Sequence, residues 1–538
     1  MDKSVKIFRT PVPILLFCCL SIFYLFTRFY HLALFPIFTD ESIYLRIAQV
    51  LTDDPGEINL FRMEGKHPLY IWLCVLAFQV VDDPLLAGRA VSVISGLASL
   101  VGIYHLTRLC YPPATAWMAA LLYLICPFPY FFERLAMVDS LLNALGIWLI
   151  YLSVRMAHGD YRGGGLLPGT VAGLAFYTKF TALIYFLPAL VAPYFFKDEK
   201  KVNFKVFYVY PILIFGFFVL ILYGLGKEIG YFHPAKPLRL PLLFLTGEQW
   251  AAFPLDIWIG NGKIVLSFLL VYFPTPIIIL SVYAIWYSIL KKDKKSLFFV
   301  FWAGFPTILI ILITSGFFSR YFIFLIAPII ILAARSACLL LEFMQNRIKE
   351  ANNPKGIFLK QQLLSAFFVV LLTIDGMDFI KKMGTNPVKA PVHELDRMLY
   401  LSGNNSGYGV REAAEFLKKQ ATKSNLLVFV PQKPGNPPEG MEVFLWKNPA
   451  ITIVPILEWK NISKRLAGDK NSLWPRSRYH KTRKQLLKID KNTNIYFLYP
   501  YTTYPESRFL QANSGFEKVW TYSHLNALDT INIFKLRS

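Results

Sequence analysis

Apolar runs long enough to cross a lipid bilayer recur along this chain from Val12 to Ile380. A hydrocarbon core about 30 Å thick requires about 20 apolar residues in a helix, because only helices and closed barrels satisfy the backbone there. The strands of a membrane barrel alternate apolar and polar residues, and these runs do not. The sequence therefore predicts a polytopic α-helical membrane protein.

About eleven runs are expected to span the bilayer. They lie near 11–31, 85–107, 113–132, 138–156, 166–178, 180–196, 206–225, 264–290, 297–314, 321–342 and 361–380. A further run, 69–81, is too short to cross and is expected to form an interfacial or re-entrant helix. Lys179 interrupts the apolar stretch 166–196, which favours a hairpin of two short spans.

Basic residues between the spans indicate their orientation. If 69–81 does not cross, the N-terminus and the later basic loops share one side, and the positive-inside rule makes that side cytoplasmic. The basic positions are Arg108, Arg155, Arg162, Lys197, Lys200, Lys201, Lys205, Lys291, Lys292, Lys294, Lys295, Arg347, Lys349, Lys355 and Lys360. We therefore expect a plasma (inner) membrane protein whose first outer loop, 32–84, is extracytoplasmic. The first apolar run lacks a small-residue cleavage site and is expected to remain as an uncleaved span.

The hydrophilic C-terminal part, 385–538, differs from the membrane part, 1–384. It predicts a small extracytoplasmic α/β domain with a helix at 411–420 and strands at 426–431, 494–499 and 530–535. The Pro/Gly-rich stretch 431–440 is expected to be a loop. This part contains no cysteine, so it must fold without disulfides. Its surplus of Lys and Arg suits contact with the anionic headgroups of membrane lipids.

The formal net charge of the whole chain is +22. In a soluble protein such a charge would suggest nucleic acid. Here the loop cations and the basic exported domain account for it, and no nucleic-acid-binding module is present. We therefore expect no nucleic-acid partner.

Two adjacent carboxylates, Asp40 and Glu41, follow the first span by about ten residues. A carboxylate can deprotonate an acceptor hydroxyl or amine during group transfer. The alternative is a helix cap, with Thr39 or Asp40 starting a helix that continues through Ile43 to Leu51.

Three further candidates come from the end of the same loop and from the next span. Lys66 could neutralise a phosphate, and His67 could hydrogen-bond to one. The alternative for His67 is a helix start, because Pro68 suits a first turn. Arg89 lies inside a span, where an arginine is costly and indicates function unless it reaches the nearby headgroups.

The remaining candidates lie at other predicted outer ends. Arg134 and Asp139 flank a short turn and could simply pair with each other. Lys179 has apolar sequence on both sides. Arg320 and Tyr321 stand at a span end, where such residues are also ordinary interface anchors. Together these residues offer a base and several cations to neutralise a phosphate leaving group beside a membrane.

In order and spacing, these residues resemble the GT-C superfamily, and most closely glycosyltransferase family 39, which includes protein O-mannosyltransferases and lipid A aminoarabinose transferases. The resemblance covers about 10–345. It rests on Asp40-Glu41, on His67-Pro68-Leu69, on Arg89 followed by Gly96, and on the segment Arg134–Ser140. Thr178-Lys179 and Arg320-Tyr321 add to it.

This resemblance implies a GT-C fold with interfacial helices and an inverting sugar transfer. The donor would be a polyprenyl-phosphate sugar, with undecaprenyl or dolichyl as the lipid, and the acceptor a lipid, a glycan or a protein. Asp40 would be the general base, and Glu41 would support it or position the acceptor. From their charge, Lys179, Arg320, Arg89 and Lys66 are expected to bind the donor phosphate, with His67, Arg134, Asp139 and Tyr321 in support.

The chain also departs from the family pattern. Pro68 is followed directly by Leu69, and Glu64 is offset by one residue from the Glu-Lys-Pro-Pro segment of the aminoarabinose transferases. Segment 226–263 is too short for the β-trefoil domains of protein mannosyltransferases. No cofactor is indicated. A divalent metal ion remains open, because Asp40, Glu41 and His67 could ligate one but show no metal-site spacing.

Two other functions fit parts of the pattern. A lipid-linked oligosaccharide ligase or polymerase would share the donor chemistry without needing the early Asp-Glu pair. A lipid or sugar transporter would often show inverted repeats, which this sequence lacks.

Overall fold

The computed structural model describes residues 11–58, 65–196, 203–227, 244–350, 357–403, 405–431, 433–456, 462, 493–500, 506–523 and 530–537. Glu64, part of the predicted outer segment 226–263 and part of the basic stretch Lys197–Lys205 lie outside these residues. The chain divides into two compact units, and each is treated by itself below.

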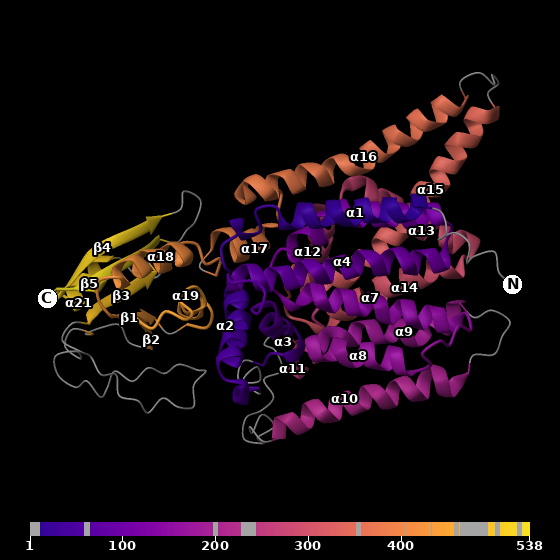
Figure 1. The fold of residues 1–538 in the computed structure, drawn as a ribbon. Helices are drawn as coiled ribbons and strands as arrows, with labels where there is room; N and C mark the ends of the chain where they lie inside the picture. Colours follow the sequence, from indigo (N-terminus) through magenta and orange to yellow (C-terminus); the bar gives the residue numbers. More distant parts are fainter. Residues whose placement is uncertain are drawn as a thin grey trace. The chain divides into compact units, whose positions relative to one another are not determined.

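The first unit comprises 1–31, 92–134 and 138–393, and it consists of apolar helices (Figure 1). Its helices are α1 (Pro11–Phe29), α4 (Pro84–Cys110, from Ser92 onward), α5 (Pro113–Ile125), α6 (Pro127–Glu133), α7 (Val138–Ala157), α8 (Leu166–Thr178), α9 (Leu183–Phe196), α10 (Tyr210–Lys227), α11 (Gly247–Ala251), α12 (Leu255–Tyr272), α13 (Thr275–Lys291), α14 (Lys294–Ile313), α15 (Ile326–Glu350) and α16 (Ile357–Thr385).

Among the described residues, eight helices are long and apolar enough to cross a membrane, or nine if the bent pair α5–α6 is one span. Shorter apolar helices include α8, α9 and α13. The prediction of a polytopic helical membrane protein is therefore confirmed. The hairpin predicted around Lys179 is also present, because α8 ends at Thr178 and a 3₁₀ turn, Phe180–Ala182, leads into α9.

Two spans differ from the prediction. The single span expected at 264–290 is wrong: α12 ends at Tyr272 and α13 begins at Thr275. Pro274 lies in the break, where its missing N–H and fixed φ oppose a continuous helix. The span expected at 113–132 is bent by 56° between α5 and α6, immediately before Pro127. Each break lies beside a proline, but the hydrophobicity of the sequence continues across it.

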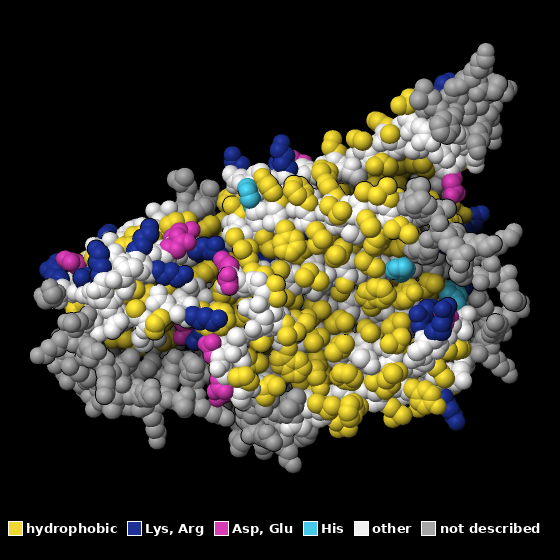
Figure 2. All heavy atoms as spheres, in the orientation of Figure 1, with side chains coloured by type: hydrophobic (Ala, Val, Ile, Leu, Met, Phe, Trp, Pro, Cys, Tyr) yellow, Lys and Arg dark blue, Asp and Glu magenta, His cyan; other side chains and the backbone are white. Residues whose placement is uncertain are grey.

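Helix α10 packs against α8 through glycines. A Cβ on Gly169 would collide with Ile214 and Pro211, and one on Gly173 would collide with Phe218. Small residues at this spacing let two helices approach closely within a membrane. The opposite face of α10 leaves Leu213, Phe217 and Leu220 between 61% and 69% exposed. Figure 2 shows hydrophobic side chains covering the visible face of the long helices, as lipid contact requires.

The second unit comprises 32–91, 135–137 and 394–538. The first predicted outer loop therefore folds together with the C-terminal part. Its helices are α2 (Thr39–Asp53), α3 (Pro68–Ala77), the start of α4, α17 (Glu394–Arg397), α18 (Val410–Ala421), α19 (Pro438–Phe444) and α21 (Glu506–Ala512). Ten residues of α3 extend about 15 Å, which is too short to cross a bilayer.

The sheet of this unit has five strands in the order β2-β1-β3-β5-β4. The strands are β1 (Leu426–Pro431), β2 (Ile451–Ile456), β3 (Asn494–Pro500), β4 (Phe516–Ser523) and β5 (Thr530–Leu536). β1 pairs in parallel with β2 and β3, whereas β5 pairs antiparallel with β3 and β4. Alternate residues such as Phe429, Phe497 and Phe534 form its core with Phe509 of α21.

The three strands expected from the sequence are the three central ones, and α18 matches the expected helix. The sequence did not indicate the edge strands β2 and β4. β2 contains Pro455, which sheets tolerate mainly at an edge, and β4 has a mostly exposed pattern. The loop expected over 431–440 is partly wrong, because α19 begins at Pro438.

Candidate active site

Asp40 lies in the first turn of α2, in the second unit. Its Oδ1 is 3.2 Å from Nζ of Lys66, and the side chains of Asp40 and Lys66 are 21% and 18% exposed. The same Nζ lies 4.6 Å from the ring centre of Tyr44. Asp40 is therefore a carboxylate that solvent or a substrate can still reach, held beside a cation.

The neighbouring carboxylate of Glu41 is completely buried. Arg89 donates from Nε to Glu41 Oε1 at 2.8 Å and from Nη2 to Oε2 at 2.9 Å. Both side chains are 0% exposed. The backbone N–H groups of Ala136 and Phe38 also donate to the Glu41 carboxylate. These contacts neutralise the charge of Glu41. A buried carboxylate without such partners would strongly destabilise the fold.

Arg89 uses all five of its N–H donors within this unit. Besides Glu41, it donates to the carbonyl oxygens of Leu32 and Phe35 from Nη1, and to that of Pro36 from Nη2. While these bonds persist, no N–H group of Arg89 remains to bind the phosphate of a sugar donor. The geometry therefore supports a structural role for Arg89, which fixes the chain ahead of α2, in place of the phosphate contact expected from its charge.

The sequence also allowed helix starts at Thr39 or Asp40 and at His67, and this alternative is partly correct. α2 begins at Thr39, but neither Thr39 nor Asp40 caps it, because Phe38 is the N-cap residue and Glu41 accepts its N–H at 2.8 Å. His67 is the N-cap residue of α3, and Pro68 occupies the first turn. The structure thus places Asp40, Glu41, Lys66, His67 and Arg89 in one unit, around the starts of α2, α3 and α4.

The first unit brings together a second set of predicted residues. Lys179 Nζ donates to Asp139 Oδ1 at 2.8 Å and lies 4.9 Å from the ring centre of Tyr321. Arg320 is 8% exposed, and its guanidinium lies 5.9 Å from that same ring. These four residues come from the start of α7, the α8–α9 turn and a 3₁₀ segment, Ser319–Leu325. Two cations and one carboxylate therefore share a small polar cluster.

Arg134 does not pair with Asp139, so that alternative from the sequence is wrong. Its guanidinium donates to the carbonyl oxygens of Thr27, Tyr30 and His31. These carbonyls lie at the end of α1, where the last turn of a helix leaves acceptors unsatisfied and favours a cation. Arg134 therefore caps the C-terminal end of α1, while Asp139 pairs with Lys179.

A buried ion pair in the first unit was not predicted. Arg28 donates from Nε to Glu133 Oε2 at 3.1 Å, and both side chains are at most 2% exposed. Tyr123 also donates to Glu133, and a Cβ on Gly96 would collide with Glu133 and with Tyr24. The signal available in the sequence was a single Arg near the end of one span and a single Glu near the end of another.

Tyr408 belongs to the segment Ser406–Val410 of the second unit. Burial, the Tyr522 phenol and the Glu412 carboxylate raise the pKa of Tyr408 to about 12. The phenol therefore stays neutral near pH 7 and is no proton acceptor there.

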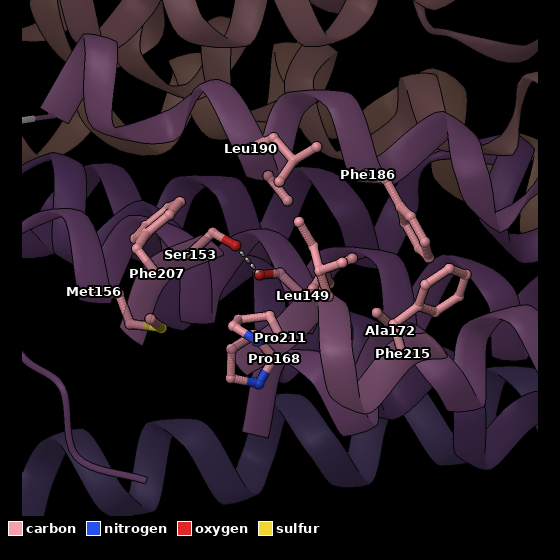
Figure 3. Close-up of a pocket in the computed structure, with 12 residues that line it drawn as sticks. Leu149, Ser153, Met156, Pro168, Ala172, Phe186, Leu190, Phe207, Pro211 and Phe215 are labelled. Atoms are coloured by element: carbon pink, nitrogen blue, oxygen red, sulfur yellow. Dashed lines mark hydrogen bonds between the residues drawn. The ribbon is translucent and has the colours of Figure 1, made fainter. Parts of the chain in front are cut away.

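The first unit contains an apolar pocket (Figure 3). Its lining side chains come from α7, α8, α9, α10 and the turn before α10, and include Leu149, Phe186 and Phe215. The one hydroxyl among them, Ser153, donates to the carbonyl of Leu149. The pocket can hold hydrocarbon, but its lining offers no group for sugar transfer.

Within the described stretches, no group of three or more His, Cys, Asp or Glu side chains could hold a metal ion.

Comparisons with known proteins agree with this fold. The sequence profile of the family described as dolichyl-phosphate-mannose-protein mannosyltransferase matches residues 65–223. No curated protein sequence matches the chain significantly. The structure resembles ArnT from Cupriavidus metallidurans in the apo state, with a TM-score of 0.60, 12% sequence identity and 97% of each chain covered.

Two ligand-bound structures are also similar. ArnT from Cupriavidus metallidurans bound to undecaprenyl phosphate gives a TM-score of 0.55 at 13% identity, with 97% of each chain covered. The archaeal oligosaccharyltransferase AglB from Archaeoglobus fulgidus, in complex with an inhibitory peptide and a dolichol-phosphate, gives 0.50 at 10% identity, covering 98% of this chain and 74% of that one. The chain has the predicted GT-C fold, and its resemblance to glycosyltransferase family 39 is confirmed.

Proposed function

We propose that this chain is an inverting glycosyltransferase that moves a sugar from a polyprenyl-phosphate donor to an acceptor at the outer face of a membrane. The observation that carries this proposal is the contrast between the two adjacent carboxylates. Glu41 is sealed by Arg89 and by two backbone N–H groups, whereas Asp40 is 21% exposed beside Lys66. Glu41 therefore has a structural role, and Asp40 is the carboxylate that a substrate can reach.

Asp40 is the general base in this proposal. As the acceptor oxygen or nitrogen attacks the anomeric carbon, its proton passes to the Asp40 carboxylate. The bond from the anomeric carbon to the phosphate oxygen breaks on the opposite face, and the polyprenyl phosphate leaves with that electron pair. A positioned carboxylate base contributes about 10²–10⁴-fold to such a step.

Lys179 and Arg320 are assigned to the phosphate of the donor, with Tyr321 beside them. Cations at a leaving phosphate stabilise the charge that develops as the bond breaks. Asp139, which is 1% exposed and 2.8 Å from Lys179, holds that ammonium in place. Lys66 is placed beside Asp40 as a further cation, whereas Arg89 is assigned to the loop.

The resemblances support the donor class. The matched family is named for a dolichyl-phosphate-linked mannose, and the two ligand-bound relatives hold undecaprenyl phosphate and a dolichol-phosphate. We propose the same kind of lipid donor for this chain. The sugar is a hexose or a pentose, and the acceptor is a lipid, a glycan or a protein.

The location follows from the positive-inside pattern and the donor chemistry. We propose a plasma (inner) membrane protein with Asp40 and the sheet-containing C-terminal part on the extracytoplasmic side. Membrane lipids surround the long helices, whose outward faces are apolar.

The test supplies a panel of radiolabelled donors, one at a time, to membranes that contain the full-length protein. The panel holds polyprenyl-phosphate sugars and lipid-linked oligosaccharide pyrophosphates. Label is followed into lipid, glycan and protein fractions. Transfer by the wild type and its loss in Asp40→Asn would support the proposal. Asp53→Asn is the matched control, because Asp53 ends the same helix and contacts Trp446 instead.

Each other outcome counts against the proposal. Transfer that survives Asp40→Asn removes the assigned base. Label taken only from the oligosaccharide-pyrophosphate donors indicates a lipid-linked oligosaccharide ligase. Absence of transfer from every donor in the panel favours a transporter.

A further inference from the structure

The segment just ahead of Asp40 has no regular secondary structure. Residues 35–38 connect a short 3₁₀ turn, Leu32–Leu34, to the first residue of α2. The direction of α2 at its start, and therefore the place of the Asp40 carboxylate, depends on what holds this backbone. Arg89 of α4 holds this backbone through the carbonyls of Phe35 and Pro36, and Glu41 of α2 holds it through the N–H of Phe38.

The C-terminal part of the same unit holds this backbone from another side. Asn436 donates from Nδ2 to the carbonyl oxygen of Ile37 at 2.6 Å and is 3% exposed. The backbone N–H and the hydroxyl of Thr39 both donate to the carbonyl oxygen of Asn405, at 3.0 and 3.1 Å. The turn into α2 is thus bonded to residues about 370–400 positions later in the chain.

Two glycines permit this close approach. Gly407 and Gly435 have φ values of +78° and +84°, which other residues rarely adopt. A Cβ on Gly407 would collide with the carbonyl of Ile37, and a Cβ on Gly435 would collide with the side chain of Thr39. Gly435 also donates its N–H to Glu439 Oε2 at 2.9 Å, which ties the Asn436 loop to the start of α19. Gly407 thereby brings the segment Ser406–Val410 against the turn ahead of α2.

From this geometry we infer that Asn436 is a positioning residue for sugar transfer, acting through the Ile37 carbonyl on the turn that presents Asp40. The inference rests on the proposed function, because it concerns the placement of the proposed base. A displacement of about 1 Å at a reacting group can cost about 10²-fold in rate. The bond from Asn436 therefore acts on the rate of the chemical step rather than on donor affinity.

The same interface supplies a matched control. Arg46 donates to Glu442 Oε2 at 2.7 Å, and Gln49 donates to the carbonyl oxygen of Val443 at 3.0 Å. These bonds join α19 to the middle of α2 and do not involve the turn at 37–39. Glu442→Gln removes the negative charge of the Arg46–Glu442 ion pair. It changes no group that contacts the turn.

The test compares full-length Asn436→Asp and Glu442→Gln with the wild type. Asn436→Asp keeps the size of the side chain but turns an oxygen toward the Ile37 carbonyl in place of the N–H donor. We expect kcat to fall by about tenfold to hundredfold with the donor KM unchanged. Glu442→Gln is expected to leave both constants at wild-type values.

Hydrogen exchange of the peptide that contains 36–46 supplies a second readout that needs no activity. Asn436→Asp is expected to speed exchange of the amides at 38 and 39, and Glu442→Gln is not. Unchanged exchange, or a kcat equal to that of Glu442→Gln, overturns the inference while the Asp40 assignment stands. If the wild type transfers no sugar, the proposed function fails, and the exchange data alone decide whether Asn436 holds the turn.

Discussion

Each unit of this protein contains an aspartate in the first turn of a helix with a lysine beside it, and the two pairs differ in exposure. In the second unit, Asp40 lies 3.2 Å from Lys66, and both side chains are about one-fifth exposed. In the first unit, Asp139 lies 2.8 Å from Lys179, but the aspartate is 1% exposed and the lysine 22%. Both partners are therefore reachable in one pair, the carboxylate included, and only the cation is reachable in the other.

This difference separates two kinds of chemistry. A carboxylate that accepts a proton from an incoming acceptor must be reachable, as Asp40 is. A cation that meets a phosphate must be reachable too, whereas its carboxylate partner serves best when it is buried and fixed. Four substitutions test this contrast.

Asp40→Asn is expected to lower kcat by about 10²–10⁴-fold, because a proton acceptor is lost while the shape of the side chain is kept. The donor KM is expected to stay near the wild-type value. Steady-state kinetics with a saturating acceptor measure both constants. A rise in donor KM with little change in kcat would mean that Asp40 binds the donor, and the contrast between the two pairs would disappear.

Glu41→Gln is expected to lower the free energy of unfolding by about 3–5 kcal/mol, because it leaves the buried Arg89 without its counter-charge. Thermal unfolding in detergent, with Asp40→Asn as the neighbouring control, measures the difference. Asp40→Asn is expected to unfold like the wild type. If the two variants proved equally stable, the division of labour between these adjacent carboxylates would be wrong.

Lys179→Met is expected to raise the donor KM by about tenfold to hundredfold, the worth of a charge-assisted hydrogen bond of about 1.5–3 kcal/mol. Asp139→Asn is expected to act in the same direction and more weakly. Because both changes disturb one contact, the double variant should lose less than the sum of the single losses. Additive losses in this double-mutant cycle would show that Asp139 does not act through Lys179.

Asp378→Asn provides the lower limit of the comparison. Asp378 pairs with Lys382 four residues later in α16, and their side chains are 52% and 44% exposed. An exposed pair of this kind contributes about 0.3–0.5 kcal/mol to stability. Unfolding should therefore shift slightly and transfer should not change. A clear loss of transfer would mean that exposure does not rank these Asp–Lys pairs.

Sequence reasoning succeeded where the signal is local. Apolar runs located the long helices, Lys179 marked the turn between α8 and α9, and the short apolar stretches 426–431, 494–499 and 530–535 coincide with the three central strands. It failed at α12–α13, because an apolar helix and an apolar break have the same composition. It also missed β2 and β4, whose pairing is decided by neighbours distant in the chain.

The candidate residues show the same limit. The residue types at Asp40, Lys179 and Arg320 could be singled out one at a time. The partners of Arg89, Arg134 and Asp139 could not, because each is chosen by packing between segments far apart in the sequence. Arg89 illustrates this well: its charge suggested a phosphate, but its five bonds to Glu41 and to three carbonyls became visible only in the fold.

The bond from Asn436 to Ile37 also bears on biosynthesis, because 399 positions separate the two residues. At a synthesis rate of about 5–20 residues per second, the turn at Ile37 waits roughly 20–80 s for the residue that completes its support. For most of its synthesis, a nascent chain therefore contains Asp40 but lacks the Asn436 bond that holds the turn ahead of it. Catalytic competence would then arise only after about four-fifths of the polypeptide, up to Asn436, has been made, so a shorter translation product would insert into the membrane without acting on the lipid-linked sugar pool.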